Sequence, residues 1–286
     1  MVKTFSVQRD AFFYEKNSRR IEMRRFFTLA IVLVTAIVLA ACESDESTLV
    51  VGLECNYAPF NWTTSEESGS QISGVNAYCD GYDIEIAQQL ADYLGRELVV
   101  RKIDWDGLIP ALTSSDIDVI IAGMSPTPTR AEVVNFSDAY FRSEQVIVVR
   151  ADSAYAEASS LDDFNGARIV AQMGTLQDDL IEQIDGAVHM NPLSDYTALV
   201  SQVSSGMSDA LIAELVVAQS IVRNNPNLTI ISFEENGFVL DESDVTVSIA
   251  VRQSETELRD SINSFLSTLT DETRNQIMED ALNRQP

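Results

Sequence analysis

Cationic and metal-binding residues are scarce in this sequence. Of 286 residues, 19 are lysine or arginine and one is histidine, against 44 aspartates and glutamates. There is no Cys-x-x-Cys motif, and with a single histidine neither a zinc nor a haem site is expected. His189 lies in a polar stretch before Asn191-Pro192, which predicts a surface residue. We therefore expect no metal and no cofactor.

A basic surface is also missing. The sequence after Ala41 holds 12 basic and 41 acidic residues, a net charge of −29. Because no basic stripe is present to meet phosphates, this balance argues against nucleic-acid binding. It is typical of a domain held away from an anionic surface by its own charge. With 45% hydrophobic residues, the chain is expected to fold into one or two globular domains.

Long apolar runs are limited to positions 26–41, a stretch that is short for a membrane-spanning helix. Met23-Arg-Arg precedes this run, and Leu-Ala-Ala-Cys ends it at Cys42. A basic flank, an apolar middle and small residues before a cut are typical of a secretion signal. The ending also resembles the bacterial lipobox, so residues 1–41 are predicted to be a lipoprotein signal peptide, with lipid on Cys42. An uncleaved membrane anchor is the alternative. Residues 1–22 form a long polar lead, which leaves Met23 as an alternative start.

Three cysteines are present, and the lipid anchor uses Cys42. Outside the cytoplasm, two leftover cysteines are more often paired than free. Cys55 and Cys79 also flank what we interpret as one edge of a pocket. We therefore favour a disulfide between them over two free thiols.

Hydrophobic patterns predict strands and helices in alternation. The expected strands are 48–53, 98–103, 118–122, 145–149, 168–172, 210–213 and 245–251. The expected helices are 81–95 with Gly95 as its stop, 105–113, 176–184, 196–204, 215–223, 255–269 and 271–283. An aromatic loop is expected at 54–62 and a polar surface loop at 63–76. This alternation indicates an α/β architecture with a largely parallel sheet.

Residues 122–130, Ala-Gly-Met-Ser-Pro-Thr-Pro-Thr-Arg, leave a buried strand and open a helix. Thr127 is a good N-cap, and Pro128 fits the first helical position, where a missing N–H costs nothing. We expect backbone N–H groups exposed near 123–125 to attract an anion, and Arg130 to add a two-pronged grip on a carboxylate. The alternative is an ordinary turn whose arginine pairs with a neighbouring aspartate.

A polar, alanine-rich stretch at 151–160 marks a crossing between two domains, because α/β material lies on both sides of it. We predict a tether at 42–47, a first lobe from 48–145 and 242–286, and a second lobe at 150–240. Two lobes joined by a double hinge form a cleft suited to enclosing a small ligand.

Six motifs, spread over essentially the whole chain after Cys42, carry a family resemblance. They are Tyr57-Ala-Pro-Phe, Gly81-Tyr-Asp-Ile-Glu-Ile-Ala, Trp105-Asp-Gly-Leu-Ile-Pro-Ala-Leu, Asp118-Val-Ile-Ile-Ala-Gly-Met-Ser-Pro-Thr-Pro-Thr-Arg, Phe136-Ser-Asp-Ala-Tyr-Phe and Gly206-Met-Ser-Asp-Ala-Leu-Ile. In this order and spacing, the chain resembles the polar amino-acid-binding proteins of ABC importers, extracellular solute-binding family 3. The resemblance implies a type II periplasmic-binding-protein fold, with two Rossmann-like lobes joined by a two-strand hinge.

The resemblance also assigns roles to residues that would hold the ligand's α-carboxylate. Arg130 corresponds to the arginine that clamps this carboxylate, with Ser125, Met124 and the Gly123 backbone beside it. Thr175 corresponds to a second-lobe group that reaches the same carboxylate when the cleft closes.

The remaining assignments concern the ammonium and the side chain of the ligand. Glu214 stands where the family usually has an aspartate that takes the α-ammonium, so the geometry must shift. Tyr57 and Trp105 align with positions that sandwich the ligand side chain, and Glu54 with an acidic position that meets its polar or cationic end. Plain core packing for Trp105 and a solvent-exposed rim carboxylate for Glu54 are the alternatives. The second-lobe face is lined by Gln172 and Leu176.

A zwitterion needs a cation near its carboxylate and an anion near its ammonium. Arg130 and Glu214 lie on opposite lobes, so ligand binding favours closure. Glu54 adds a second anion, and no pocket lysine is expected, which favours Arg, Lys, His or Gln over Asp or Glu as ligand. The sequence thus predicts a monomeric, lipid-anchored receptor outside the cytoplasm that delivers a polar or basic amino acid to a membrane permease.

Two other functions remain as alternatives. A lyase of the cyclohexadienyl dehydratase type would recruit Glu54 or Glu214 as acid or base. A ligand-sensing subunit of a signalling receptor would have to signal through another protein, because no kinase or coiled coil is recognisable. We expect a binding protein and not an enzyme.

Overall fold

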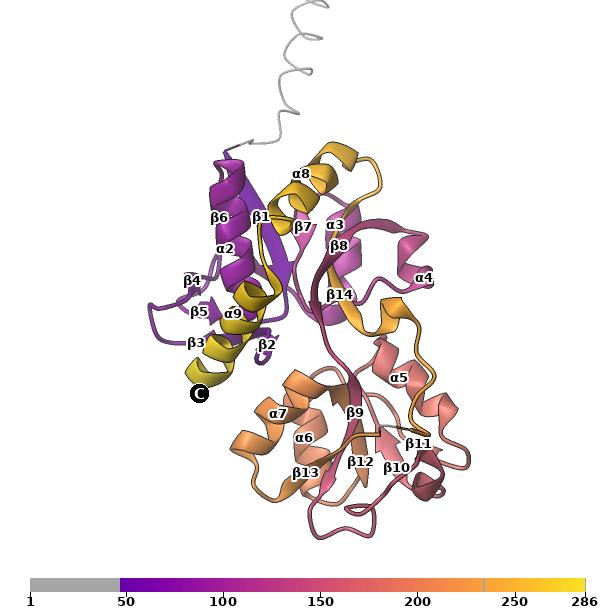
Figure 1. The fold of residues 1–286 in the computed structure, drawn as a ribbon. Helices are drawn as coiled ribbons and strands as arrows, with labels where there is room; N and C mark the ends of the chain where they lie inside the picture. Colours follow the sequence, from indigo (N-terminus) through magenta and orange to yellow (C-terminus); the bar gives the residue numbers. More distant parts are fainter. Residues whose placement is uncertain (1–46, 234, 286) are drawn as a thin grey trace, which may run out of the picture. The chain divides into compact units, whose positions relative to one another are not determined.

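The computed structural model describes residues 47–233 and 235–285 (Figure 1). The predicted signal peptide, the alternative start at Met23 and the lipidation site at Cys42 lie outside the described residues, so these predictions stay predictions. Among the helices that the structure describes, none is both long enough and apolar enough to cross a bilayer.

The first of two five-stranded sheets has the order β6–β1–β7–β14–β8. Strand β1 pairs in parallel with β6 and β7, whereas β14 runs antiparallel to β7 and β8. In this sheet the expected parallel arrangement is therefore confirmed only for β6, β1 and β7. The five strands of the sheet are β1 (Thr48–Leu53), β6 (Glu97–Lys102), β7 (Val119–Ile120), β8 (Val134–Arg142) and β14 (Thr246–Arg252).

The second sheet repeats this plan with the order β11–β10–β12–β9–β13. Strand β10 pairs in parallel with β11 and β12, and β9 runs antiparallel to β12 and β13. Its strands are β9 (Gln145–Arg150), β10 (Arg168–Val170), β11 (Val188–His189), β12 (Ala210–Glu214) and β13 (Leu228–Ile231). We call the first sheet with its helices lobe 1 and the second sheet with its helices lobe 2.

Helices surround both sheets (Figure 1). Those of lobe 1 are α2 (Tyr82–Leu94), α3 (Leu108–Thr113), α4 (Pro128–Ala131), α8 (Thr256–Leu266) and α9 (Asp271–Arg284); those of lobe 2 are α5 (Leu176–Leu180), α6 (Tyr196–Ser204) and α7 (Leu215–Asn224). Short 3₁₀ turns are η2 (Trp105–Gly107), η3 (Leu161–Phe164), η4 (Ile181–Gln183) and η5 (Glu242–Asp244). Helix α2 buries Ile86 and Leu90 on one face. It ends, as predicted, at Gly95, which adopts the left-handed conformation.

The chain passes from lobe 1 to lobe 2 where β8 runs into β9, and it returns ahead of β14 (Figure 1). The crossing predicted at 151–160 is therefore wrong, because β9 already belongs to the second sheet. The two crossovers are bonded side by side, because the Ser143 N–H donates to the Val245 carbonyl at 2.9 Å. The antiparallel strands of both sheets, β14 and β9, are the strands that follow these crossovers. A double connection of this kind restricts relative motion of the lobes to hinge bending.

The expectation of plain loops at 54–62 and 63–76 is wrong. Three short strands there, β2 (Asn56–Tyr57), β3 (Asn61–Thr64) and β4 (Ser70–Gln71), form an antiparallel sheet of order β2–β3–β5–β4 with β5 (Tyr78–Asp80), which follows them. Sequence patterns hide such strands, since they span only two to four residues, too few for an alternation of apolar and polar residues to show. Strands β8, β11 and β13 also lie where no strand is predicted.

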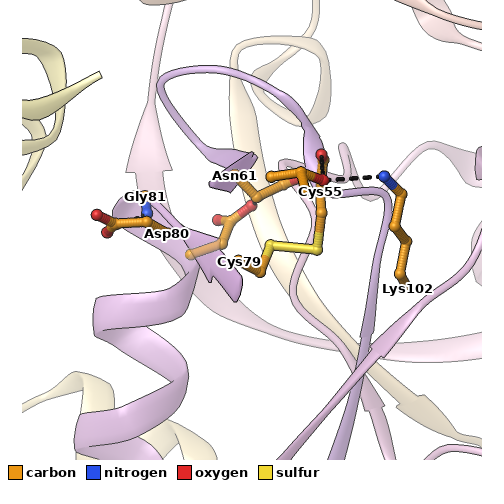
Figure 2. Close-up of a disulfide and its surroundings, with 8 residues drawn as sticks. Cys55, Asn61, Cys79, Asp80, Gly81 and Lys102 are labelled. Carbon is orange, nitrogen blue, oxygen red and sulfur yellow. Dashed lines mark hydrogen bonds between the residues drawn. A yellow bond between two sulfur atoms is a disulfide. The ribbon is translucent and has the colours of Figure 1, made fainter. Parts of the chain in front are cut away.

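The predicted disulfide between Cys55 and Cys79 is confirmed, with 5.6 Å between the two Cα atoms (Figure 2). It ties the segment that follows β1 to β5. Beside it, the Lys102 ammonium donates to the Thr63 hydroxyl at 2.9 Å, and that hydroxyl donates to the Cys55 carbonyl at 2.8 Å. The cross-link thereby fixes the chain that carries Glu54 on one side and Tyr57 on the other.

Candidate functional site

The predicted site residues follow the carboxyl ends of parallel strands in both lobes. Glu54 comes directly after β1 and Gly123 shortly after β7, whereas Gln172 follows β10 and Glu214 ends β12. In open α/β sheets, ligands bind in the crevice beyond these strand ends. The topology therefore brings residues that are far apart in sequence to facing edges of the two lobes.

A pocket between the lobes collects ten of the eleven predicted residues. It is lined by Glu54, Tyr57, Trp105, Gly123, Ser125, Arg130, Gln172, Thr175, Leu176, Gln177 and Glu214. Its volume is about 10 Å³, room for a single water molecule. A wider chamber of about 570 Å³ adjoins it, and Met124, the eleventh predicted residue, lies in the wall of that chamber.

Hydrogen bonds across the cleft hold the pocket narrow. The Tyr57 hydroxyl of lobe 1 donates to the Glu214 carboxylate of lobe 2. The Gln172 side-chain amide donates to Glu54 Oε1 at 2.7 Å and to the Ser194 carbonyl at 2.9 Å. Each predicted carboxyl group of the pocket is thus paired with a neutral donor from the opposite lobe.

Arg130 is the cation of the pocket. Thr127 caps helix α4 and Pro128 opens it, as predicted. The Arg130 guanidinium donates to the Ser125 carbonyl at 2.9 Å and, across the cleft, to the Gly174 carbonyl at 3.2 Å. No ion pair of Arg130 with an aspartate or glutamate occurs within the described part of the chain, so the alternative of an ordinary arginine–aspartate turn is wrong. Burial lowers the pKa of Arg130 to about 10.

Trp105 lies against this arginine. The guanidinium carbon of Arg130 is 5.0 Å from the centre of the Trp105 ring, a cation–π distance. The indole N–H of Trp105 donates to the Gly174 carbonyl at 3.1 Å. Because this bond joins the two lobes, Trp105 does more than pack the core of lobe 1.

The two glutamates are buried acids. Glu54 is 6% exposed, so the alternative of a solvent-exposed rim carboxylate is wrong. Burial raises the pKa of Glu54 to about 7, and the nearby carboxylates of Asp104 and Asp195 act in the same direction. Burial also raises the pKa of Glu214, against the opposing effect of its hydrogen bond from Tyr57. A cation placed between them would favour the ionised form of both.

Gly123 shapes the pocket without offering its N–H to it. Its φ is positive, in the left-handed region, and a Cβ atom there would lie 2.9 Å from the Tyr57 ring. Its N–H donates to the Tyr140 hydroxyl at 2.9 Å, and that hydroxyl donates to buried Asp83 at 2.7 Å. The expectation that this N–H is exposed to an anion is therefore wrong, because a buried tyrosine takes it.

Thr175 and Gln177 position the lobe 2 face of the pocket. The Thr175 hydroxyl donates to the Gln172 carbonyl at 2.7 Å and caps α5 by accepting from the Asp178 N–H. Gln177, which sequence reasoning missed, donates to Gln145 Oε1 at 3.0 Å and lines the pocket together with Glu214. The sequence places Gln177 only two residues after Thr175, and this proximity was the one sign of its role. Only the direction of α5 shows which side chains at the start of that helix face the cleft.

Metal-ligand geometry is absent from residues 47–233 and 235–285, where no group of three or more histidines, cysteines, aspartates or glutamates could hold a metal ion. His189 is exposed in β11, as predicted, and its ring contacts the Asp178 carboxylate at 2.7 Å.

The model of the bacterial extracellular solute-binding proteins, family 3, matches residues 49–283. The chain belongs to this family. Solute-binding proteins of family 3 are binding proteins of transporters, so this chain is not an enzyme, in agreement with the prediction from sequence. The resemblance carried by the six motifs is confirmed at the level of the family.

Named relatives align over nearly their whole length. The arginine-binding extracellular protein ArtP of Bacillus subtilis (strain 168) is 30% identical over 264 residues, which cover 87% of this chain and 94% of ArtP. The ABC transporter glutamine-binding protein GlnH of the same organism is 26% identical over 267 residues, covering 88% and 94%.

A solved structure of a similar protein confirms the fold. It is an amino acid ABC transporter substrate-binding protein from Streptococcus pneumoniae, crystallised with L-arginine, and it superimposes with a TM-score of 0.73 at 26% identity. The match covers 83% of this chain and 95% of that one. The predicted two-lobed periplasmic-binding-protein fold is therefore correct.

Proposed function

We propose that this protein captures a polar or basic L-amino acid, with L-arginine as the first candidate, and delivers it to the membrane permease of an ABC importer. The observation that carries the proposal is one guanidinium, Arg130, facing two buried carboxyl groups, Glu54 and Glu214, in a pocket between two lobes. An amino acid with a cationic side chain carries the complementary set of one anion and two cations.

Each end of the ligand has a partner in this arrangement. The α-carboxylate would lie on Arg130, whose guanidinium offers five donors and uses two of them on the carbonyls of Ser125 and Gly174. The α-ammonium would lie on Glu214 and the side-chain cation on Glu54. Burial of a charge is costly unless it is paired, so the pocket selects ligands that pair all three groups.

The surplus of acid restricts the ligand class. Asp104, Asp106 and Asp195 add negative charge around Glu54, and among the residues that line the pocket Arg130 is the only cation. A ligand with an acidic side chain would meet repulsion at Glu54. The relatives named for arginine and glutamine support a basic or amide-bearing ligand.

Binding requires the pocket to exchange partners. The ligand α-ammonium would replace the Tyr57 hydroxyl at Glu214, and the side-chain cation would replace the Gln172 amide at Glu54. Since each of these bonds joins the two lobes, the lobes must part to admit the ligand and close again around it. The ligand then contacts both lobes and stabilises the closed state.

The proposal includes a lipid anchor on Cys42, which holds a monomeric receptor on the outer side of the cell membrane, beside its permease. The support is the Leu-Ala-Ala-Cys sequence at residues 39–42. Mass spectrometry of the mature N-terminus tests it: a diacylated Cys42 supports the anchor, and an intact segment 1–41 contradicts it.

Isothermal titration of the purified protein against the twenty amino acids tests the transport function. We expect micromolar or tighter binding of arginine, weaker heat with lysine, histidine or glutamine, and none with aspartate or glutamate. Absence of heat with arginine, lysine, histidine and glutamine alike would overturn the proposal.

A further inference from the structure

A chain of buried amides connects the pocket to the hinge. Gln145 is the first residue of β9, directly after the first crossover, and its amide N–H donates to the Asp244 carbonyl at 3.0 Å. Asp244 lies in η5, on the second crossover, just before β14. One side chain of lobe 2 therefore ties the two crossovers together.

Gln177 continues this chain into the pocket. Its amide donates to Gln145 Oε1 at 3.0 Å, and Gln177 lines the same pocket as Glu214, where it favours the ionised carboxylate. Glu214 is itself the cross-strand partner of Gln145 in the β12–β9 register. Hydrogen bonds thus run from the Asp244 carbonyl through Gln145 to Gln177, and Glu214, in the same pocket lining as Gln177, accepts from the Tyr57 hydroxyl across the cleft.

Because the two glutamines are buried, this series of contacts is sensitive to the loss of any one residue in it. Gln145 is 6% exposed and Gln177 is 4% exposed, so neither can replace a lost partner with bulk water. A buried amide left without its partner keeps the full penalty of its lost hydration. The orientation of each amide is also fixed by its neighbours, because Gln145 accepts through its oxygen and donates through its nitrogen.

We propose that Gln145 and Gln177 are positioning residues of lobe closure, which transmit the occupancy of Glu214 to the bond between the two crossovers. This inference rests on the proposed function, in which a ligand ammonium replaces Tyr57 at Glu214. The Glu214 carboxylate then turns toward the ligand and Gln177 moves with it. The position of Gln177 in turn decides whether the Gln145 amide keeps its hydrogen bond to the Asp244 carbonyl. Closure of the hinge and capture of the ligand are thus coupled through one set of hydrogen bonds.

The test uses Gln145→Met, Gln177→Met and the double variant, since methionine keeps the length of the side chain and removes its hydrogen bonds. Gln183→Met is the matched control. Gln183 also lies in lobe 2 but does not line the pocket. Its side chain accepts from the Val239 N–H at 2.8 Å and donates to the Val239 carbonyl at 3.1 Å, on the segment that leads back to lobe 1.

Two measurements are made on each variant. Calorimetry gives the dissociation constant for L-arginine, and small-angle X-ray scattering gives the radius of gyration with and without it.

We call Gln145→Met, Gln177→Met and the double variant the relay variants. We expect each of them to weaken arginine binding about tenfold and to increase the radius of gyration of the ligand-free protein. The double variant should bind arginine no more weakly than the weaker-binding single variant, since either substitution already interrupts the series of hydrogen bonds. Gln183→Met should match the wild-type protein in both measurements.

The proposal is overturned if the two single losses add in the double variant, or if the relay variants match Gln183→Met. If the wild-type protein binds no amino acid, the proposed function fails by itself. The ligand-free radii of gyration then still decide the relay: equal radii for all variants contradict it, and larger radii for the relay variants alone support it.

Discussion

Acidification should release arginine because it protonates Glu54. The pKa of this carboxyl group is raised to about 7 by burial, and the nearby carboxylates of Asp104 and Asp195 act in the same direction. A ligand guanidinium pairs with the ionised form only. Below pH 7, binding must first remove a proton from Glu54, so arginine affinity should fall with pH in a range where an exposed glutamate stays ionised.

The size of the effect follows from the same pKa. At pH 5.5, roughly 3% of a carboxyl group with a pKa of 7 is ionised, against roughly 90% at pH 8. The dissociation constant for arginine should therefore rise about 30-fold between these values, which is about 2 kcal/mol. Glutamine, which accepts and donates hydrogen bonds without a side-chain charge, should lose less affinity over the same range.

Calorimetry in two buffers of different ionisation enthalpy measures both quantities. It gives the dissociation constant and the number of protons released, which should approach one near pH 6 for arginine. The control is Glu54→Gln, which should bind arginine more weakly at pH 8 and depend on pH less steeply than the wild-type protein, keeping only the share that buried Glu214 contributes. A dissociation constant for arginine that stays constant from pH 8 to 5.5, with no proton release, would refute this reasoning.

Three further outcomes follow from the same structure. Because burial raises the pKa of both Glu54 and Asp83 to about 7, the native state binds more protons than the unfolded state between about pH 4.5 and 7. The unfolding free energy, measured in urea, should therefore fall as the pH rises through this range, by about 1.4 kcal/mol per group and pH unit. Asp83→Asn should remove its share of this dependence, and stability that rises over this range would contradict the assignment. Loss of the disulfide in a Cys55→Ser, Cys79→Ser variant should cost about 3 kcal/mol in the same assay, since it closes a loop of moderate length; an unchanged midpoint would argue against a cross-link. Gly123→Ala should cost about 1–3 kcal/mol and weaken arginine binding, since the backbone there is in the left-handed region; a fully stable, fully binding variant would show that this backbone shape is dispensable.

Local pattern was sufficient to predict most of the regular elements. Strand β1 is found over the same residues as predicted, and Gly95 ends α2 as its position indicates. These elements carry strong signals, since apolar periodicity and a glycine in left-handed conformation both act within a few residues. The small sheet of β2–β5 carries no such signal. It depends on a disulfide and on pairing partners from separate parts of the chain, as in the pairing of Thr63 with Cys79.

The pocket was predictable to the extent that strand ends and motifs identify it. Glu54, Arg130 and Glu214 stand at facing strand or loop ends, and the family resemblance named all three. Gln177 and the capture of the Gly123 N–H by Tyr140 were not predictable. Both depend on how side chains distant in sequence orient once the core is packed, which periodicity and composition do not describe.

Carboxylate recognition by Arg130 is the central claim, and a calorimetric cycle tests it most directly. L-Arginine and agmatine, which is arginine without its α-carboxylate, are titrated into the wild-type protein and into Arg130→Gln. A desolvated charge pair between guanidinium and carboxylate predicts that the variant loses about 100-fold in affinity for arginine, about 3 kcal/mol, and nothing for agmatine. Equal losses for both ligands would contradict the account.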